Sequence, residues 1–128
     1  MNKYRNKFEA KTGKFLEQSK VDFEYEKTKL EYTVSGKYLV DFGFFTKSGK
    51  KIYIETKGNG LSFDGHTKRK MRAVKLLHPE IDIRIVFYAN GKCGPKRKDG
   101  TFMRQLDWAE KYGFPAAIKD IPESWLDE

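Results

Sequence analysis

The chain has 128 residues and one cysteine, Cys93, which suits a single domain with one core in a reducing compartment and excludes an intramolecular disulfide. Its 26 Lys and Arg residues against 18 Asp and Glu give a net charge of +8, which indicates a polyanionic partner such as nucleic acid or, alternatively, only a soluble basic surface. Residues 1–5 lead into no apolar run and no stretch approaches the roughly 20 apolar residues that span a bilayer, so we expect no signal peptide, no membrane segment and a cytoplasmic location.

The N-terminal third of the chain predicts one helix followed by strands. Over residues 4–19 apolar and small side chains recur on one helical face, and Glu9 lies beside that face. Apolar and charged residues then alternate over residues 21–25, as in a strand. The alternation resumes over residues 30–34 after a break at residues 27–29, so a second strand segment is expected there.

Residues 38–45 and 51–56 predict a β-hairpin joined by a turn at residues 47–49. Gly49 suits the left-handed position of a three-residue loop, so Thr46 is expected to pair with Lys50. The register then gives three further pairs: Phe45 with Lys51, Gly43 with Tyr53, and Asp41 with Glu55.

The second half of the chain predicts a crossover unit and a helical end. A helix over residues 67–77 stops at His78 before a proline, and residues 81–88 form a buried strand parallel to residues 51–56. Residues 92–98 are expected to form a basic loop, residues 102–113 a helix ending at a glycine, and residues 121–126 a short helical turn. The predicted class is α/β, with a mixed sheet flanked by helices.

The predicted hairpin carries the residues with the clearest chemistry. Asp41 and Glu55 would face each other, and like charges in that position need something positive between them. Lys57 follows Glu55 by two residues and so projects from the same face of the strand. Two hard oxygen ligands beside an ammonium group suit Mg²⁺ or Mn²⁺ and the hydrolysis of a phosphodiester, although the three charges could also form only a solvated surface.

Candidate DNA contacts come from the basic segments of the second half. They favour phosphate binding over base reading, and they are Lys68, Arg69, Lys70, Arg72, Lys96, Arg97 and Lys98. His66 and His78 have poor spacing for a zinc site, which favours structural or surface roles for both, and His66 is close enough to the hairpin in sequence to contact phosphate.

Asp41 followed by Glu55-Thr56-Lys57 matches the Asp…(Asp/Glu)-x-Lys core of the restriction-endonuclease-like superfamily, with Val40 where a proline is usual. The whole chain resembles the bacteriophage endonuclease I family of Holliday junction resolvases. Separate blocks in the same order carry this resemblance, and they lie at residues 4–9, 23–26, 41–42, 55–58, 78–87, 108–111 and 121–125.

The resemblance implies a catalytic set of Glu9, Asp41, Glu55 and Lys57 and two Mg²⁺ ions per active site, with Mn²⁺ as a substitute. Asp41 would share the two ions, Glu55 and the Thr56 carbonyl would hold one, and Glu9 would help to hold the other. It also implies a homodimer in which about residues 1–26 are exchanged between subunits and residues 27–37 bridge them. Arg5 is a further candidate DNA contact.

We therefore expect a structure-selective DNA endonuclease that resolves four-way junctions and other branched DNA in the cytoplasm of a host cell. Two alternatives stay open. A nicking or homing endonuclease of the same fold would cut a defined sequence in unbranched duplex. A non-catalytic basic DNA-binding module would need neither the acidic residues nor Lys57.

Overall fold

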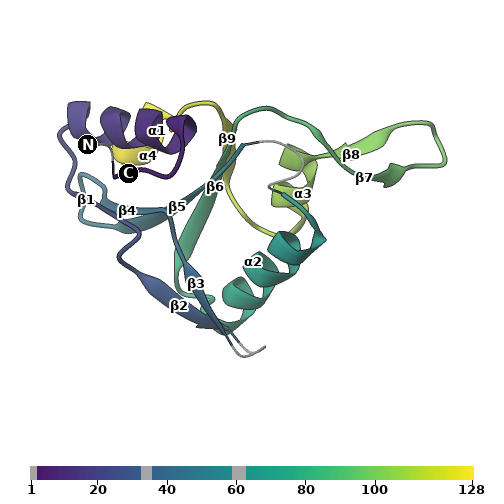
Figure 1. Cartoon of the computed structure of the whole chain (residues 1–128), viewed down its shortest axis with the longest axis horizontal. Helices are drawn as coiled ribbons and strands as arrows, with labels where there is room; N and C mark the ends of the chain where they lie inside the picture. Colours follow the sequence, from purple (N-terminus) through teal and green to yellow (C-terminus); the bar gives the residue numbers. More distant parts are fainter. Residues whose placement is uncertain (1–2, 33–35, 59–62) are drawn as a thin grey trace.

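The computed structural model describes residues 3–32, 36–58 and 63–128 (Figure 1). A five-stranded sheet lies at its centre, in the order β1-β4-β5-β6-β9. Its members are β1 (Phe23–Tyr25), β4 (Phe42–Phe45), β5 (Lys51–Lys57), β6 (Asp82–Phe87) and β9 (Ala116–Ile118). β1, β4 and β5 pair antiparallel, whereas β5, β6 and β9 pair parallel. The mixed sheet and the parallel crossover are therefore confirmed.

The central hairpin has the predicted register. The Thr46 N–H donates to the Lys50 carbonyl at 2.8 Å, and the pairs Phe45 with Lys51 and Gly43 with Tyr53 both form. The first strand differs from the prediction because it divides at residues 40–41 into β3 (Gly36–Leu39) and β4. β3 pairs with β2 (Lys29–Tyr32) in a separate two-stranded ribbon, so the chain changes partner at that bend. The predicted strand position Val34 lies outside the described residues.

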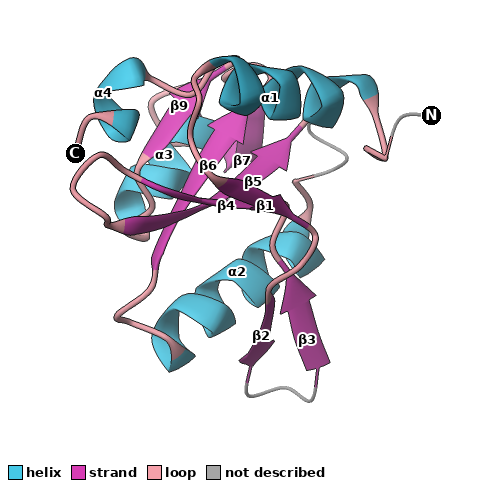
Figure 2. Ribbon diagram, turned by 90° about the vertical axis from the view of Figure 1, so that its left-hand side faces the viewer, coloured by secondary structure: helices cyan, strands magenta, loops and turns pink. Residues whose placement is uncertain are grey.

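Helices cover both faces of the sheet (Figure 2). One face packs against α1 (Lys7–Gln18) and α4 (Glu123–Leu126), through a cluster that includes Leu16, Ile52 and Ile54. The other face packs against α2 (Gly65–Leu77) and α3 (Gln105–Lys111), through a cluster that includes Met71, Ile83 and Trp108. The alternation of β5 thus puts Ile52 and Ile54 into one layer of the core and leaves the intervening residues on the other face.

Side chains fix the two long helices at their starts. The Asn6 carboxamide accepts from the Glu9 N–H at 2.8 Å, which starts α1 three residues later than predicted and places Glu9 in its first turn. The Asp64 carboxylate accepts from the Thr67 N–H at 2.8 Å and starts α2 at Gly65. In the part of the chain that the structure describes, no helix has the length and apolar character to cross a membrane.

The predicted loop at residues 92–98 is instead a strand. β7 (Lys92–Lys96) pairs with β8 (Phe102–Arg104), so the predicted helix at 102–113 is shortened to α3. This β7–β8 hairpin extends away from the body of the protein (Figure 1). Buried Gln105 closes its base, because its N–H donates to the Gly91 carbonyl and its side-chain oxygen accepts from the Gly91 N–H, both at 2.8 Å. Neither strand carries an apolar alternation that would have predicted it.

Candidate active site

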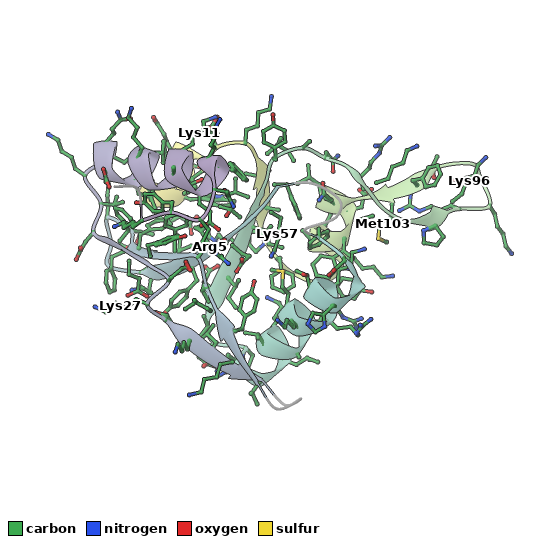
Figure 3. All side chains as sticks on the ribbon, in the orientation of Figure 1. Arg5, Lys11, Lys27, Lys57, Lys96 and Met103 are labelled. Atoms are coloured by element: carbon green, nitrogen blue, oxygen red, sulfur yellow. The ribbon has the colours of Figure 1, made fainter. Side chains whose placement is uncertain are left out.

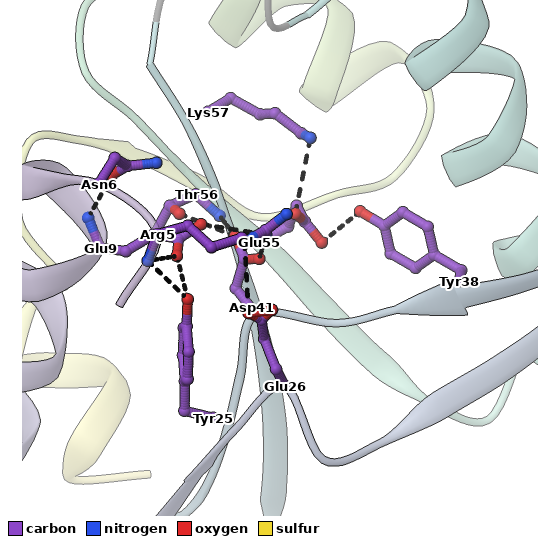
Figure 4. Close-up of polar contacts among 10 residues, drawn as sticks. All are labelled: Arg5, Asn6, Glu9, Tyr25, Glu26, Tyr38, Asp41, Glu55, Thr56 and Lys57. Carbon is purple, nitrogen blue, oxygen red and sulfur yellow. Dashed lines mark hydrogen bonds and ion pairs between the residues drawn. The ribbon is translucent and has the colours of Figure 1, made fainter. Parts of the chain in front are cut away.

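The charged residues of the predicted site meet where β5 ends and β4 begins (Figure 4). Asp41 immediately precedes β4, while Glu55, Thr56 and Lys57 are the last three residues of β5. Asp41 is only 1% exposed and Glu55 only 3%. Two carboxylates buried this deeply are not a solvated surface, so the alternative of an ordinary exposed hairpin face is excluded.

Asp41 is held by the end of β5. Its Oδ2 accepts from the Thr56 N–H at 2.9 Å and from Thr56 Oγ1 at 2.8 Å. The Lys57 carbonyl accepts from the Tyr88 N–H on the β6 side of the strand. In a strand the N–H and the carbonyl of one residue point to the same side, and those of the next residue point to the opposite side. The Thr56 carbonyl therefore faces the Asp41 side, as the Thr56 N–H does. Asp41 and this carbonyl are therefore placed to share a cation.

Glu55 lies between a phenol and an ammonium group. The Tyr38 hydroxyl donates to its Oε2, and Lys57 Nζ lies 3.5 Å from its Oε1. Burial, and next the nearby charge of Asp41, raise the pKa of Glu55 well above its ordinary value despite Lys57. Burial and the Glu55 charge likewise raise the pKa of Tyr38, which keeps this hydroxyl a donor. Burial and the neighbouring carboxylate thus disfavour the charged form of Glu55.

Helix α1 adds Glu9 to the same place. The Glu9 side chain is buried, its Oε1 accepts from the Tyr25 hydroxyl, and its Oε2 accepts from Arg5 Nη2 at 3.1 Å. The same Arg5 nitrogen donates to Asp41 Oδ1 at 2.9 Å, which joins Glu9 to the hairpin residues. We call Glu9, Asp41, Glu55, Thr56 and Lys57 the acidic site. In this single chain residues 3–26 pack on the chain's own sheet. The exchange of residues 1–26 with a second subunit stays a prediction.

Four residues that support the acidic site were not assigned this role from the sequence. Arg5 was expected only to contact DNA, yet it bridges Glu9 and Asp41, and its Nε lies 3.3 Å from Glu26 Oε1. From the sequence, Tyr25 and Tyr38 were interpreted only as apolar residues of predicted strands. Their hydroxyl contacts, like those of Arg5 and Glu26, depend on how separate segments pack.

The donor set suits a hard divalent cation. Carboxylate oxygens with a backbone carbonyl are ligands that Mg²⁺ accepts. Among the described residues, no three acidic, histidine or cysteine side chains are close enough together to enclose a metal as they stand. Arg5, placed between Glu9 and Asp41, fills part of that space with its own charge.

Comparisons with known proteins agree with the sequence resemblance. The family described as phage endonuclease I matches residues 1–128. Endonuclease I of Escherichia phage T7 is 33% identical over 126 residues, covering 98% of this chain and 79% of its own length. Endodeoxyribonuclease 1 of Enterobacteria phage T3 is 32% identical over 126 residues, covering 98% of this chain and 78% of its own length.

The chain belongs to the phage endonuclease I family. The sequence resemblance is thereby confirmed.

In this member of the phage endonuclease I family, the candidate DNA contacts divide between two surfaces. The first is α2, where His66, Arg69 and Arg72 are exposed.

Two of the α2 cations are partly engaged within the protein. Lys68 Nζ donates to the Cys93 carbonyl and lies 5.3 Å from the centre of the Phe63 ring. The Arg72 guanidinium lies 4.2 Å from the centre of the Tyr112 ring. Lys70 is half-buried. Packing therefore gives these side chains a structural role that the sequence did not predict.

The second basic surface is the β7–β8 hairpin. Lys96, Arg97 and Lys98 are all exposed at its outer part, and Figure 3 shows Lys96 far from Lys57. The hairpin follows β6, whose end lies beside the end of β5, because Lys57 pairs with Phe87. The β7–β8 hairpin thus starts near the strand ends that carry the acidic site and extends away from that site.

Proposed function

We propose that this chain is a Mg²⁺-dependent, structure-selective DNA endonuclease that resolves four-way junctions and other branched DNA by phosphodiester hydrolysis. The observation that carries the proposal is the buried cluster of Glu9, Asp41 and Glu55 beside Lys57, in which the pKa of Glu55 is raised by burial and by Asp41. The mixed sheet, with acidic residues at the start of β4 and the end of β5, supports a restriction-endonuclease-like fold.

Each residue of the acidic site has a role in this proposal. Asp41 would share two cations, Glu55 and the Thr56 carbonyl would hold one, and Glu9 would help to hold the other. Bound Mg²⁺, or Mn²⁺ in its place, would supply charge stabilisation to the phosphoryl group under attack. Lys57, 3.5 Å from Glu55 and 15% exposed at its side chain, can orient a water molecule and offset negative charge on the phosphate.

The basic surfaces would supply most of the affinity for DNA. Exposed cations on α2 and on the β7–β8 hairpin favour contacts with phosphates, which carry no sequence information. Recognition of a branch by the placement of its phosphates would follow, with weak dependence on sequence. We include Arg69, Lys96, Arg97 and Lys98 in this surface, together with His66 and the exposed part of Arg72.

A homodimer with exchanged residues 1–26 is also part of the proposal, because two sites related by a twofold axis can cut two strands symmetrically. β2 and the first two residues of β3 belong to the bridging region, 27–37, which would either fold back or pass to a second subunit. Inactive Glu9→Ala and Lys57→Ala chains, refolded together, would then form heterodimers with one intact site and partial activity. Verified heterodimers with no activity would contradict the exchange.

The experiment that tests the proposed activity compares two substrates with the same arm sequences, an immobile four-way junction and a linear duplex. Each is incubated with Mg²⁺ or with EDTA. Paired incisions near the branch that require Mg²⁺ and are absent from the duplex are expected. Cutting of the duplex at one sequence would identify a nicking or homing endonuclease instead. Tight binding without incision under any divalent metal would identify a non-catalytic DNA-binding module.

A further inference from the structure

Arg5 places a positive charge between two buried carboxylates of the acidic site. A single nitrogen, Nη2, donates to Asp41 Oδ1 at 2.9 Å and to Glu9 Oε2 at 3.1 Å (Figure 4). Both carboxylates have other donors, since Thr56 donates to Asp41 and Tyr25 donates to Glu9. Among the described residues, Arg5 alone adds a full positive charge in direct contact with both carboxylates.

The Arg5 side chain is far more exposed than the two carboxylates that it bridges. It is 59% exposed, so it can leave the buried carboxylates without disturbing the core. Its Nε lies 3.3 Å from Glu26 Oε1, a carboxylate closer to the surface. Glu26 is held in place in a left-handed backbone conformation, with φ of 49°, and its N–H donates to the Asp41 carbonyl at 3.0 Å. Glu26 can thus retain the guanidinium after Nη2 withdraws.

We propose that Arg5 is an internal counter-cation that competes with the divalent metal for Glu9 and Asp41. In the metal-free protein it bridges the two carboxylates, and when metal binds it turns toward Glu26. A guanidinium and a divalent cation cannot use the same carboxylate oxygens, because the cation needs those oxygens at about 2.1 Å. The inference rests on the proposed function, since it takes Glu9 and Asp41 as metal ligands.

The competition would be the same in an exchanged dimer. Arg5, Glu9 and Glu26 all belong to residues 1–26, so an exchanged segment would carry the three side chains together to the partner's Asp41. Arg5 would then also hold the exchanged segment on the partner before metal arrives. The proposal therefore does not depend on which chain supplies the segment.

The test is a titration of the protein with Mn²⁺ in the absence of DNA, in which free Mn²⁺ is counted by electron paramagnetic resonance. The variants are Arg5→Ala and Arg5→Gln, the second of which keeps a hydrogen-bond donor but has no charge. The matched control is Lys11→Ala, which removes an exposed cation of α1 that pairs with Asp120 at 3.4 Å, away from the acidic site. Thermal unfolding is measured for all four proteins in EDTA.

Both Arg5 variants are expected to bind Mn²⁺ about tenfold more tightly than wild type, which corresponds to about 1.4 kcal/mol. They are also expected to unfold at a lower temperature in EDTA, while Lys11→Ala matches wild type in affinity. Unchanged or weaker Mn²⁺ binding in folded Arg5 variants would overturn the proposal, because Arg5 would then position the carboxylates for the metal. Failure of the proposed function would be seen separately, as absence of Mg²⁺-dependent junction cleavage by the wild-type protein.

Discussion

Two groups of charged side chains lie at opposite ends of the neighbouring strands β5 and β6, and they differ in how their charges are balanced. The acidic site lies at the end of β5. The other group, which we call the Arg84 cluster, lies at the starts of the same strands and consists of Lys50, Asp82, Arg84 and Glu128.

In the Arg84 cluster each carboxylate contacts two cations. Arg84 lies 2.8 Å from Asp82 and 2.5 Å from Glu128, and Lys50 lies 2.9 Å and 3.2 Å from the same two residues. Hydrogen bonds from Arg84 lower the pKa of Glu128 to about 2. Burial alone would raise the pKa of Asp82, but the bonds from Arg84 and Lys50 outweigh burial and lower it.

In the acidic site the balance is reversed. Burial and Asp41 raise the pKa of Glu55, although Lys57 lies beside it. Both groups contain carboxylates and cations within hydrogen-bonding distance, so a list of ion pairs would not separate them. The direction of the pKa shift does separate them, because burial outweighs the nearby ammonium group at Glu55, whereas hydrogen bonds from two cations outweigh burial at Asp82. The Arg84 cluster thus has the charge balance of a structural ion-pair network, whereas that of the acidic site is consistent with the proposed cation binding.

The largest expected effect is on catalysis. Lys57→Ala should lower the single-turnover rate of junction cleavage by about 1,000-fold or more, because it removes the ammonium group beside Glu55. Junction affinity should change little, since cations elsewhere contact the phosphates. The matched control is Lys51→Ala on the same strand, whose ammonium pairs with Glu24 at 3.4 Å. Equal losses of rate in both variants would contradict the specific role of Lys57.

The next effect is on stability. Arg84→Met should lower the free energy of unfolding by about 1.5–3 kcal/mol, because it removes the buried cation that hydrogen-bonds two partly exposed carboxylates and leaves them with Lys50 alone. Urea denaturation measures the change, and Lys47→Met, which removes an exposed partner of Asp127, should lower the free energy of unfolding far less. If Arg84→Met and Lys47→Met lower the free energy of unfolding equally, the Arg84 cluster does not stabilise the fold.

A smaller effect should have opposite signs in the two groups. In EDTA, Glu55→Gln should raise the free energy of unfolding by about 1 kcal/mol, because it relieves the crowding of buried negative charge. Asp82→Asn should lower it by about 1–3 kcal/mol, because it removes an acceptor from Arg84. Changes of the same sign in the two variants would remove the distinction between the groups.

The smallest effect is a dependence of stability on pH. The pKa of Glu128 in the folded protein, about 2, lies below its ordinary value of 4.5, so its contribution is complete above about pH 4.5 and is lost as the pH falls toward 2. The side chain is 35% exposed, and solvent screening should keep the contribution below about 1 kcal/mol. Glu128→Gln should therefore weaken the loss of unfolding free energy as the pH falls from about 4.5 toward 2. The same pH dependence in wild type and Glu128→Gln would contradict the stabilising role of Glu128.

The sequence predicted those parts of the fold that have a local signal. The alternation of β5 put Ile52 and Ile54 in the core and Glu55 and Lys57 on the opposite face, and the turn chemistry predicted the hairpin register. The bend at Asp41 was missed because it arises from a change of strand partner. The strand β9 was missed because three residues are too few to show a period.

The acidic site was predicted only in part for a similar reason. Asp41, Glu55 and Lys57 lie on two strands joined by one turn, so their spacing indicated that they meet. Glu9 lies 32 residues before Asp41, and nothing in its own segment indicates that α1 places it there, so it was reached only through the family resemblance. The roles of Arg5 and Tyr38 depend on tertiary packing, which no local pattern specifies.

The most direct test of the distinction between the two groups is junction cleavage by Glu55→Gln and Asp82→Asn under single-turnover conditions with Mg²⁺, at a temperature where both proteins are folded. We predict that Glu55→Gln binds the junction but does not cut it, whereas Asp82→Asn cuts at close to the wild-type rate despite its lower stability. Cleavage by Glu55→Gln at the wild-type rate, or loss of cleavage by folded Asp82→Asn, would contradict the assignment of the acidic site as the catalytic centre.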